Sequence, residues 1–399
     1  MLSSKRITLL PILNQNILRD PQNMEIMLIF VALVLSFILV LIVIPSILSV
    51  ARAKKIYEPF DKRKIHTQII PPLGGVAIFF GVTLSTIIAS DGYSFDSLKY
   101  KIAAVMLMFF IGLKDDLLIV SNRKKLIVQI FAAVMLITLG NIRLTNLHGI
   151  FGIYEINYLS GMLITLFAIV VIINSFNLID GIDGLASGLA MLAGTVFGIW
   201  FYLAGHIQHA ILSFALVGSL AGFFLYNVFG HRNKLFMGDS GSLVVGLIIS
   251  IIVIQFNEFN IVKTIPFAIG AAPVVSFAII IVPLVDTLRV MTIRIMQKQS
   301  PFSADNNHIH HRLLSLVPSH LKVTLIIVAV NAFLIGIAFL FNNISFNVNF
   351  QFLFLFLIAL VLFRLPSFMG RMIKHKNIQE KHLYSRIGLR RYLIFRMLF

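Results

Sequence analysis

The sequence predicts an all-α integral membrane protein, a polytopic bundle of about eleven transmembrane helices. Of the 399 residues, 58% are hydrophobic and 12% are charged, and the mean hydropathy is +0.95. Ordinary globular domains are about 45–50% apolar, so a water-soluble core could not bury this much apolar surface. The apolar runs are continuous over roughly 16 to 25 residues, as spanning helices require, whereas the strands of a membrane barrel alternate in polarity.

The spans are expected to alternate in direction across the membrane. Loops on one side are rich in lysine and arginine, whereas "SDGYSFDS" and "FNEFN" on the other side are acidic or neutral. Because basic residues concentrate in cytoplasmic loops, the N-terminus is expected outside and the C-terminus in the cytoplasm. The expected spans are residues 26–50, 73–90, 101–113, 126–140, 156–173, 185–204, 208–229, 242–257, 264–285, 322–341 and 350–363.

The formal net charge of +17 fits this arrangement. In a soluble protein such a charge would indicate nucleic acid, but here basic loops beside anionic headgroups explain it, so membrane lipids and no nucleic acid are expected as partners. The absence of cysteine excludes disulfides, thiolate metal sites and a thiol nucleophile. Residues 24–363 are expected to form one transmembrane domain, between a mixed N-terminal extension at 1–23 and a basic cytoplasmic tail at 364–399.

Five polar segments interrupt the apolar sequence, and all of them fall at span ends expected in the cytoplasm. They are "HTQIIPPLGG" (66–75), "GLKDDLL" (112–118), "NSFNLIDGIDGLASGL" (174–189), "KLFMGDSGSL" (234–243) and "DNNHIHHRLL" (305–314). Simple turns would not place so many carboxylates, glycines and histidines on one side only, so a shared active site is expected. Within 174–189, the residues Asn177, Asp180 and Asp183 recur at i, i+3 and i+6 and would share one helix face.

The acidic residues favour phosphate and metal chemistry. Asp115 and Asp116 are adjacent, so in a helix their side chains diverge by about 100°, and one can take a metal or a proton while the other pairs with a lysine. Asp239 is followed by Ser-Gly-Ser, where backbone amides at a helix start are open to phosphate oxygens. Asn177 and Asp239 offer hard oxygen ligands, which suit Mg²⁺.

A histidine-rich stretch forms the last polar segment. His308, His310 and His311, followed by Arg312, can hydrogen-bond a diphosphate or take up charge that develops on a leaving group. The alternatives are a zinc site or a solvated loop. Zinc is disfavoured because His-x-His-His lacks the partner spacing of the usual zinc signatures.

These segments, taken in order, resemble the motifs of the polyprenyl-phosphate N-acetylhexosamine-1-phosphate transferases (glycosyltransferase family 4). The likeness is greatest to the bacterial undecaprenyl-phosphate N-acetylglucosaminyl 1-phosphate transferases. "RKIHTQIIPPLGG" resembles the first family motif, "DD" followed by "KLIVQ" the first acidic motif, and "NSFNLIDGIDGLASG" the central motif. "FMGDSGS" is similar to the metal motif, and "PLVDTLRVMTIRI" with "SPFSADNNHIHHRLL" to the nucleotide-sugar loop. The resemblance extends from about Lys62 to Leu314.

The resemblance implies a role for each matched residue. Asn177 and Asp239 would hold Mg²⁺, for which Mn²⁺ could substitute. Asp115 and Asp116 would engage the lipid phosphate or its proton. The residues expected to bind or line the nucleotide-sugar site are Lys125, Asp180, Asp183, His308, His310, His311 and Arg312. Asp180 is also counted with the catalytic carboxylates.

The reaction implied is transfer of an N-acetylhexosamine 1-phosphate from a UDP-sugar to undecaprenyl phosphate, with release of UMP at the cytoplasmic face of a bacterial plasma membrane. The lipid phosphate could attack the β-phosphorus directly, or a two-step route could pass through an aspartyl-phosphate. N-acetylglucosamine is the expected sugar, because the related phospho-MurNAc-pentapeptide translocases carry consecutive histidines where this chain has "HIHHR". A homodimer is compatible with the sequence.

Two further classes of function are weighed against this one. An ion-coupled transporter would place carboxylates near the bilayer centre between paired repeats, whereas here they cluster at helix ends. A scaffold with a dead site would show degraded motifs, and none of the five is degraded.

Overall fold

The computed structural model describes residues 21–56, 70–90, 95–298, 308–344, 346–365 and 368. Most of the extension at 1–23 and of the tail at 364–399, together with His66 and residues 299–307, lies outside this part of the chain. In order, the elements are α1 (Pro21–Lys54), α2 (Gly74–Ala89), α3 (Phe95–Leu117), α4 (Asn122–Thr138), β1 (Asn146–Ile150), β2 (Ile153–Glu155), α5 (Tyr158–Ile179), α6 (Leu185–Leu203), α7 (Ile207–Phe229), α8 (Gly238–Phe259), α9 (Ala272–Ile279), α10 (Ile281–Met296), α11 (Ile309–Leu314) and α12 (His320–Asn343). A C-terminal helix (Val348–Leu365) follows.

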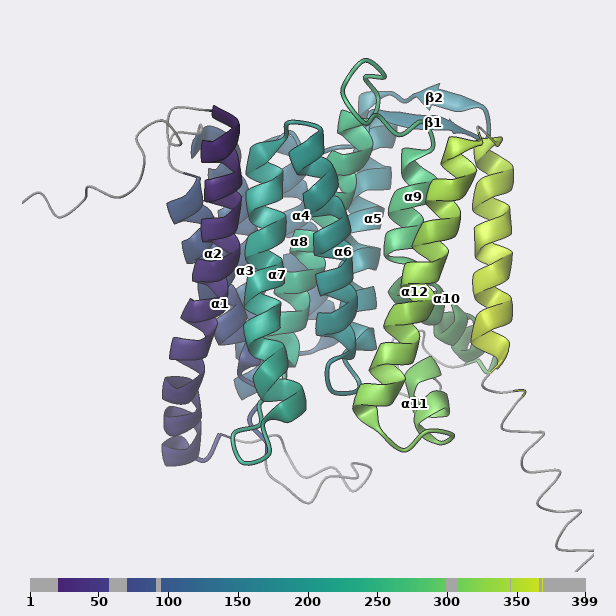
Figure 1. Ribbon diagram of the computed structural model, residues 1–399. Helices are drawn as coiled ribbons and strands as arrows, with labels where there is room; N and C mark the ends of the chain where they lie inside the picture. Colours follow the sequence, from purple (N-terminus) through teal and green to yellow (C-terminus); the bar gives the residue numbers. More distant parts are fainter. Residues whose placement is uncertain are drawn as a thin grey trace, which may run out of the picture.

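The helices form one upright bundle (Figure 1). Helical residues occur in every predicted span, so the all-α membrane fold is confirmed, with one short antiparallel hairpin added by β1 and β2. Among the described helices, seven are long and apolar enough to cross a membrane, or up to eight if one bent pair is a single span. The count of eleven crossings and their direction therefore stay predictions.

The predicted span at 264–285 is wrong in its bounds, because two helices bent by 76° replace it. α9 begins at Ala272 and ends at Ile279, the helix is interrupted at Ile280, and α10 runs from Ile281 to Met296. Pro283 explains the break, since proline has no N–H to donate to the carbonyl four residues earlier. Asn331 of α12 replaces that donor, because its amide nitrogen lies 2.9 Å from the Ile279 oxygen.

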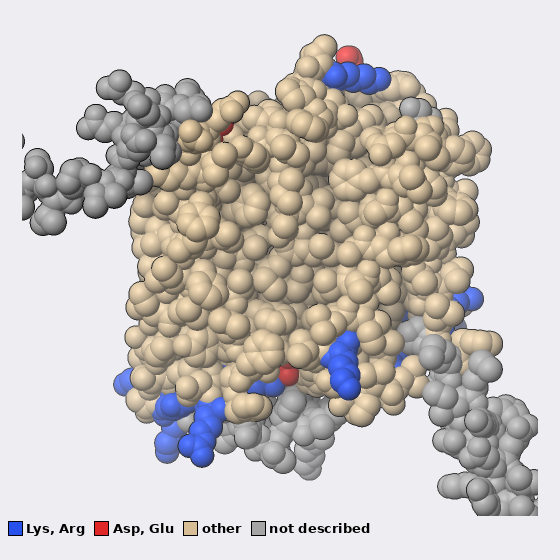
Figure 2. Space-filling model, viewed as in Figure 1, with Lys and Arg blue, Asp and Glu red and all other residues tan. Residues whose placement is uncertain are grey.

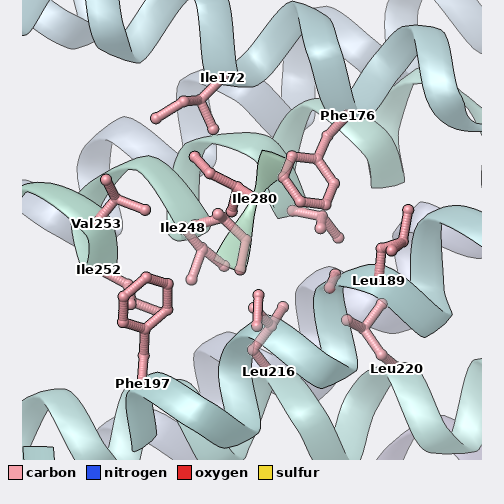
Figure 3. Packing of buried hydrophobic residues seen from close by; sticks show 14 of the residues in the cluster. Ile172, Phe176, Leu189, Phe197, Leu216, Leu220, Ile248, Ile252, Val253 and Ile280 are labelled. Atoms are coloured by element: carbon pink, nitrogen blue, oxygen red, sulfur yellow. The ribbon is translucent and has the colours of Figure 1, made fainter. Parts of the chain in front are cut away.

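α8 lies in the middle of the bundle and is its most buried span, with 78% of its apolar window inside the protein. It packs mainly against α3 and α5, and also against α2 and α6. Figure 3 shows the packing: Ile248 and Ile252 of α8 lie among apolar side chains from the surrounding helices, including Phe176, Phe197 and Leu216. This burial fixes the position of the first residues of α8, which contain Asp239.

Glycines bring α2 and α3 against the start of α8. A Cβ atom at Gly75 would lie 2.1 Å from the Gly241 nitrogen, and one at Gly112 would lie 2.5 Å from the Ser240 Cα. Such distances leave no room for a side chain, so the backbones are in direct contact. The chain at Pro71–Gly75 also pairs with the segment before α8, because the Gly75 nitrogen donates to the Met237 oxygen at 2.8 Å.

The two ends of the bundle differ in charge. In the view of Figure 2, most visible lysines and arginines lie along one end, and the flanks are almost free of charge. The polar segments at 112–118, 174–189, 234–243 and 308–314 belong to this basic end, whereas the β1–β2 hairpin lies at the opposite end (Figure 1). We call these the basic end and the hairpin end.

Substituting Gly75 by alanine should destabilise the protein. The new methyl group would meet backbone atoms of α8 that cannot rotate away, and overpacking of this kind costs about 1–3 kcal/mol. Thermal unfolding of the detergent-solubilised protein should therefore show a lower midpoint for Gly75→Ala. The matched control is Gly336→Ala in α12, where a Cβ would meet nothing within 4 Å. Equal midpoints for the two variants would contradict the close contact.

Candidate active site

Four helices bring five predicted residues together at the basic end, and we call this group the carboxylate cluster: Asp115, Asp116, Lys125, Asn177 and Asp239. The Lys125 ammonium donates to Asp115 Oδ2 at 3.1 Å and to Asp239 Oδ2 at 2.6 Å. The Asn177 amide nitrogen lies 3.2 Å from Asp239 Oδ1, although the two residues are 62 positions apart. These residues come from three separate motifs, and the structure brings them together as the sequence predicts.

Asp116 holds the beginning of α8. Its Oδ1 accepts a hydrogen bond from the Asp239 amide at 2.7 Å, and its Oδ2 accepts from the Ser240 amide at 3.0 Å and from the Ser240 hydroxyl. A carboxylate at a helix N-terminus is favourable because the first amides lack partners within the helix. These amides were expected to be open to phosphate, and that expectation is wrong, because Asp116 already occupies them.

Asp115 points away from Asp116, as adjacent helical residues should. One of its oxygens accepts from the Val120 amide at 2.6 Å, and the other contacts Lys125. The site also depends on Gly238, which has φ +71°, and a Cβ there would lie 2.7 Å from the Asp116 carboxylate. Only glycine allows the backbone to approach Asp116 this closely.

The carboxylate cluster fits a magnesium ion by its donor set. The Lys125 ammonium contacts two carboxylates, those of Asp115 and Asp239, so a divalent cation would balance the negative charge that one ammonium group leaves. Rotating the Asn177 amide by half a turn would place its oxygen where the nitrogen now faces Asp239, and the two orientations differ only in hydrogen bonding. Mg²⁺ is commonly bound through one or two protein oxygens, with waters and substrate phosphates completing the shell.

In the part of the chain that the structure describes, no three histidine, aspartate or glutamate side chains are placed to hold one metal ion. The histidine-rich stretch instead uses its rings in other contacts.

Asp183 joins three segments of the basic end. Its Oδ2 lies 2.6 Å from the Lys234 ammonium and 2.7 Å from Nδ1 of His320, at the start of α12. Burial alone would raise the pKa of Asp183, but the hydrogen bonds and charges of His320 and Lys234 outweigh it and hold the pKa below its usual range. Nearby, Asn227 accepts from the Gly184 amide at 2.7 Å and donates to the Leu235 oxygen at 2.9 Å.

The expected common helix face at 177–183 is only partly present. α5 ends at Ile179, so Asp180 is its C-cap residue and Asp183 lies beyond the helix. Gly184 explains the rapid reversal, since its φ of +79° favours glycine and it directly precedes α6. Asn177 therefore faces Asp239, while Asp183 turns towards Lys234 and His320.

The histidine-rich stretch is anchored by Asp286 of α10, which is fully buried. Asp286 Oδ2 lies 2.8 Å from His308 Nδ1, and its Oδ1 accepts from the Ile309 amide at 3.0 Å and from Arg289 at 2.9 Å. His308 thus fixes the position of the short helix α11. His311 and Arg312 follow on α11 and are half-buried.

His310 is placed against the central motif. A Cβ at Gly181 would lie 2.1 Å from its Nε2, so Gly181 is what lets the ring approach. The side chain is 1% exposed, and neither ring nitrogen has a hydrogen-bond partner among the described residues. Burial, followed by the nearby charge of His311, lowers the pKa of His310 to about 3. The neutral ring therefore has unused hydrogen-bonding capacity beside Gly181 of the central motif.

Lys234, His320 and Asp286 were not predicted to take part. Asp286 carried a usable signal, because an aspartate inside an apolar helix needs a partner. Lys234 stands in a predicted motif, but nothing in its spacing indicates Asp183. His320 lies 137 residues from Asp183 and outside the region of family resemblance, so only the folded chain reveals the contact.

A bundle of apolar helices with carboxylates, an amide, a lysine and a histidine stretch at one end defines an integral membrane enzyme whose site lies at the helix ends. Residues 99–257 match the family described as glycosyl transferase family 4. The chain belongs to that family, and the resemblance stated from the motifs is confirmed.

Relatives with curated names support this membership. The chain is 31% identical over 312 residues to the probable undecaprenyl-phosphate N-acetylglucosaminyl 1-phosphate transferase of Bacillus subtilis, which covers 78% of this chain and 83% of that protein. It is 32% identical over 255 residues to the undecaprenyl-phosphate alpha-N-acetylglucosaminyl 1-phosphate transferase of Yersinia pestis, covering 63% and 67%. The protein is therefore a phosphosugar transferase of the membrane.

The buried neutral His310 should make the ligand-free protein sensitive to acid. Between pH 6.5, where an unfolded histidine titrates, and about 3, the unfolded chain takes up a proton that folded His310 does not. Stability should therefore fall as the pH falls through this window. Replacing His310 by phenylalanine removes that dependence, so the loss of thermal midpoint from pH 7.5 to 5.5 should be smaller in the variant.

The control for this measurement is His231→Asn, which also removes one histidine but from an exposed position. It should retain the acid dependence of the unsubstituted protein. An unchanged dependence in His310→Phe would show that His310 does not titrate abnormally.

Proposed function

We propose that this protein transfers N-acetylglucosamine 1-phosphate from UDP-N-acetylglucosamine to undecaprenyl phosphate. The products are undecaprenyl-diphospho-N-acetylglucosamine and UMP, and the reaction initiates a cell-envelope polysaccharide. The proposal depends on one observation: three residues from three different motifs meet at Asp239. The Lys125 ammonium lies 2.6 Å from one Asp239 oxygen, and the Asn177 amide nitrogen lies 3.2 Å from the other. The printed activity of the relatives supports the same chemistry.

The site is proposed to face the cytoplasm of a bacterial plasma membrane. The basic end visible in Figure 2 is the end that carries the carboxylate cluster, and positive residues favour the cytoplasmic side. A site at this level suits the two substrates, because the nucleotide sugar is soluble and the phosphate of the lipid lies among the headgroups.

Direct attack by the lipid phosphate on the β-phosphorus is the proposed route. A phosphate monoester titrates near pH 6, so it is largely dianionic at neutral pH and is already a competent nucleophile. Both Asp116 oxygens are hydrogen-bonded to α8, and Asp115 contacts Lys125 and the Val120 amide. These contacts support positioning roles for the two aspartates over formation of an aspartyl-phosphate.

Lys125 and Asp239 orient the reacting groups. When substrate enters, the Lys125 ammonium can exchange a carboxylate partner for a phosphate oxygen, since its ion-pair partners among the described residues are Asp115 and Asp239. Mg²⁺, held by Asn177 and Asp239, would neutralise charge on the diphosphate, and Mn²⁺ would serve the same purpose. The charged groups would act in a partly buried site, where their effect on developing charge is large.

The donor would be held by the central motif and the histidine stretch. His310 has two ring nitrogens without partners among the described residues, and His311 and Arg312 follow it on α11. Asp183 is kept ionised by Lys234 and His320 and can accept hydrogen bonds from hydroxyl or amide groups of the nucleotide sugar. Asp180 lies three residues before Asp183 and next to Gly181, against which the His310 ring packs.

A radiolabelled transfer assay in membranes tests the proposal. UDP-N-acetylglucosamine should give a lipid-extractable product together with UMP, and excess UDP-MurNAc-pentapeptide should not compete. Transfer of the pentapeptide nucleotide alone would place the protein with the phospho-MurNAc-pentapeptide translocases. Absence of any lipid-linked product from active membranes would reject the transferase reaction.

Replacing Asp239 by asparagine should abolish most of the turnover. The change keeps size and hydrogen bonding but removes the charge that Lys125 and a divalent ion would share, so activity should fall about 100-fold or more. Magnesium-titrated activity of the purified variant measures this effect. The matched control is Glu155→Gln, which removes one carboxylate charge from an exposed residue at the hairpin end.

Equal thermal midpoints of Asp239→Asn and the control would show that the loss is not unfolding. An active Asp239→Asn enzyme with unchanged magnesium dependence would contradict the proposed metal pair.

A further inference from the structure

The β1–β2 hairpin presents an apolar tip at the hairpin end of the bundle (Figure 1). Phe151 is 87% exposed, and Tyr154 is 62% exposed. Residues 146–154 include no lysine, arginine, aspartate or glutamate. Burial lowers the pKa of His148 below its usual value, so its ring is neutral at pH 7 as well. The tip itself, residues 150–154, therefore has no charged side chain and is mainly apolar.

The backbone holds Phe151 outward in a conformation that phenylalanine rarely adopts. Its φ is +52°, in the left-handed region, where a residue other than glycine is strained. Asn349, in the first turn of the C-terminal helix, fixes this geometry: its Oδ1 accepts from the Phe151 amide at 2.8 Å, and its amide nitrogen lies 3.3 Å from the Gly149 oxygen. The hydrogen bond from the Phe151 amide to Asn349 thus holds the Phe151 ring outward.

The base of the hairpin is tied to the far end of α8. Thr145 donates to Glu258 through its amide at 2.7 Å and through its hydroxyl at 2.8 Å. His148 Nε2 lies 3.0 Å from the Asn257 oxygen. The hairpin is therefore a rigid attachment to the bundle, and not a free loop.

The exposed apolar surface continues from the tip onto candidate membrane spans. Tyr158 and Leu159 in the first turn of α5 are 55% and 60% exposed. Phe350, in the first turn of the C-terminal helix, is 61% exposed. Both helices are long and apolar enough to cross a membrane, so their outward faces contact lipid. The tip thus adjoins a lipid-facing surface, and aromatic residues are enriched where such surfaces meet the headgroups.

We propose that the hairpin tip is a lipid anchor: Phe151 and Tyr154 insert into the boundary between headgroups and acyl chains of the leaflet opposite the candidate active site. An uncharged, aromatic, outward-held tip fits that environment because aromatic rings are favoured there and charged groups are not. The occupant of the surface is the lipid itself.

The anchor fixes the far ends of two helices that matter for the site. α5 follows the hairpin directly and carries Asn177 in its last turn, while α8 carries Asp239 at its start and Glu258 at its end. Holding Thr145 against Glu258 therefore sets the relative height of α5 and α8. In this way the anchor ties the hairpin end of both helices to the level of one membrane surface.

Tryptophan fluorescence in lipid nanodiscs tests the proposal. The chain has one tryptophan, Trp200, which is 5% exposed, so the unsubstituted protein supplies the background to subtract. Phe151→Trp places a probe of similar size at the tip. Phe167→Trp, at a residue of α5 that is 68% exposed and far from both helix ends, supplies a deep reference.

The expected result is that the Phe151→Trp signal is emitted to the blue of aqueous N-acetyltryptophanamide. Lipids brominated near the headgroup should quench it more than lipids brominated near the chain end, with the reverse order for Phe167→Trp. Quenching by acrylamide as strong as for N-acetyltryptophanamide, without quenching by either lipid, would place the tip in water and overturn the proposal. Protection from both acrylamide and brominated lipid would mean that protein covers the tip, and would overturn it equally.

Discussion

The contact between the Asp116 carboxylate and the first amides of α8 determines where the carboxylate cluster lies. A buried helix start exposes unpaired N–H groups, and here the side chain of another helix satisfies two of them, at Asp239 and Ser240. Because Gly75 and Gly112 let α2 and α3 touch the same turn, α8 cannot slide along its axis. Asp239 is thereby held beside Lys125 and Asn177 without needing a substrate to position it.

The same principle recurs at two other buried carboxylates. Asp183 binds Lys234 and His320 and so connects the segment before α8 to the start of α12. Asp286 binds His308 and the Ile309 amide and so holds the histidine stretch against the bundle. Removing a charge from water is costly, so each carboxylate is retained with several donors around it. Asp116, Asp183 and Asp286 thus each hold a different segment at the basic end of the bundle.

The broken helix α9–α10 contributes to this order. Pro283 prevents a continuous helix, and Asn331 of α12 satisfies the Ile279 oxygen that the break leaves without a helical donor. The bend of 76° redirects α10, which carries Asp286, away from the direction of α9. The interruption of the helix at Ile280 therefore helps to position Asp286, which holds the histidine stretch.

The sequence by itself determined the helical membrane fold and the family, and it predicted which residues lie together in the carboxylate cluster. Continuous apolar runs identify spans without any knowledge of packing, and the motifs place Asp115, Lys125, Asn177 and Asp239 at helix ends on one side of the bundle. Local pattern could not reveal that Asp116 occupies the α8 amides, because that contact depends on how closely two glycine-lined backbones approach.

Only the tertiary structure decided the long-range pairs and the ends of elements. The end of α5 at Ile179 sends Asp183 to Lys234 and His320 and away from Asn177, which helical periodicity could not indicate. His320 carries no local signal, since its role arises from a contact with a residue 137 positions away. The physical reason is general: periodicity reports which face of a helix is apolar, whereas the partner of a buried charge is set by the packing of distant segments.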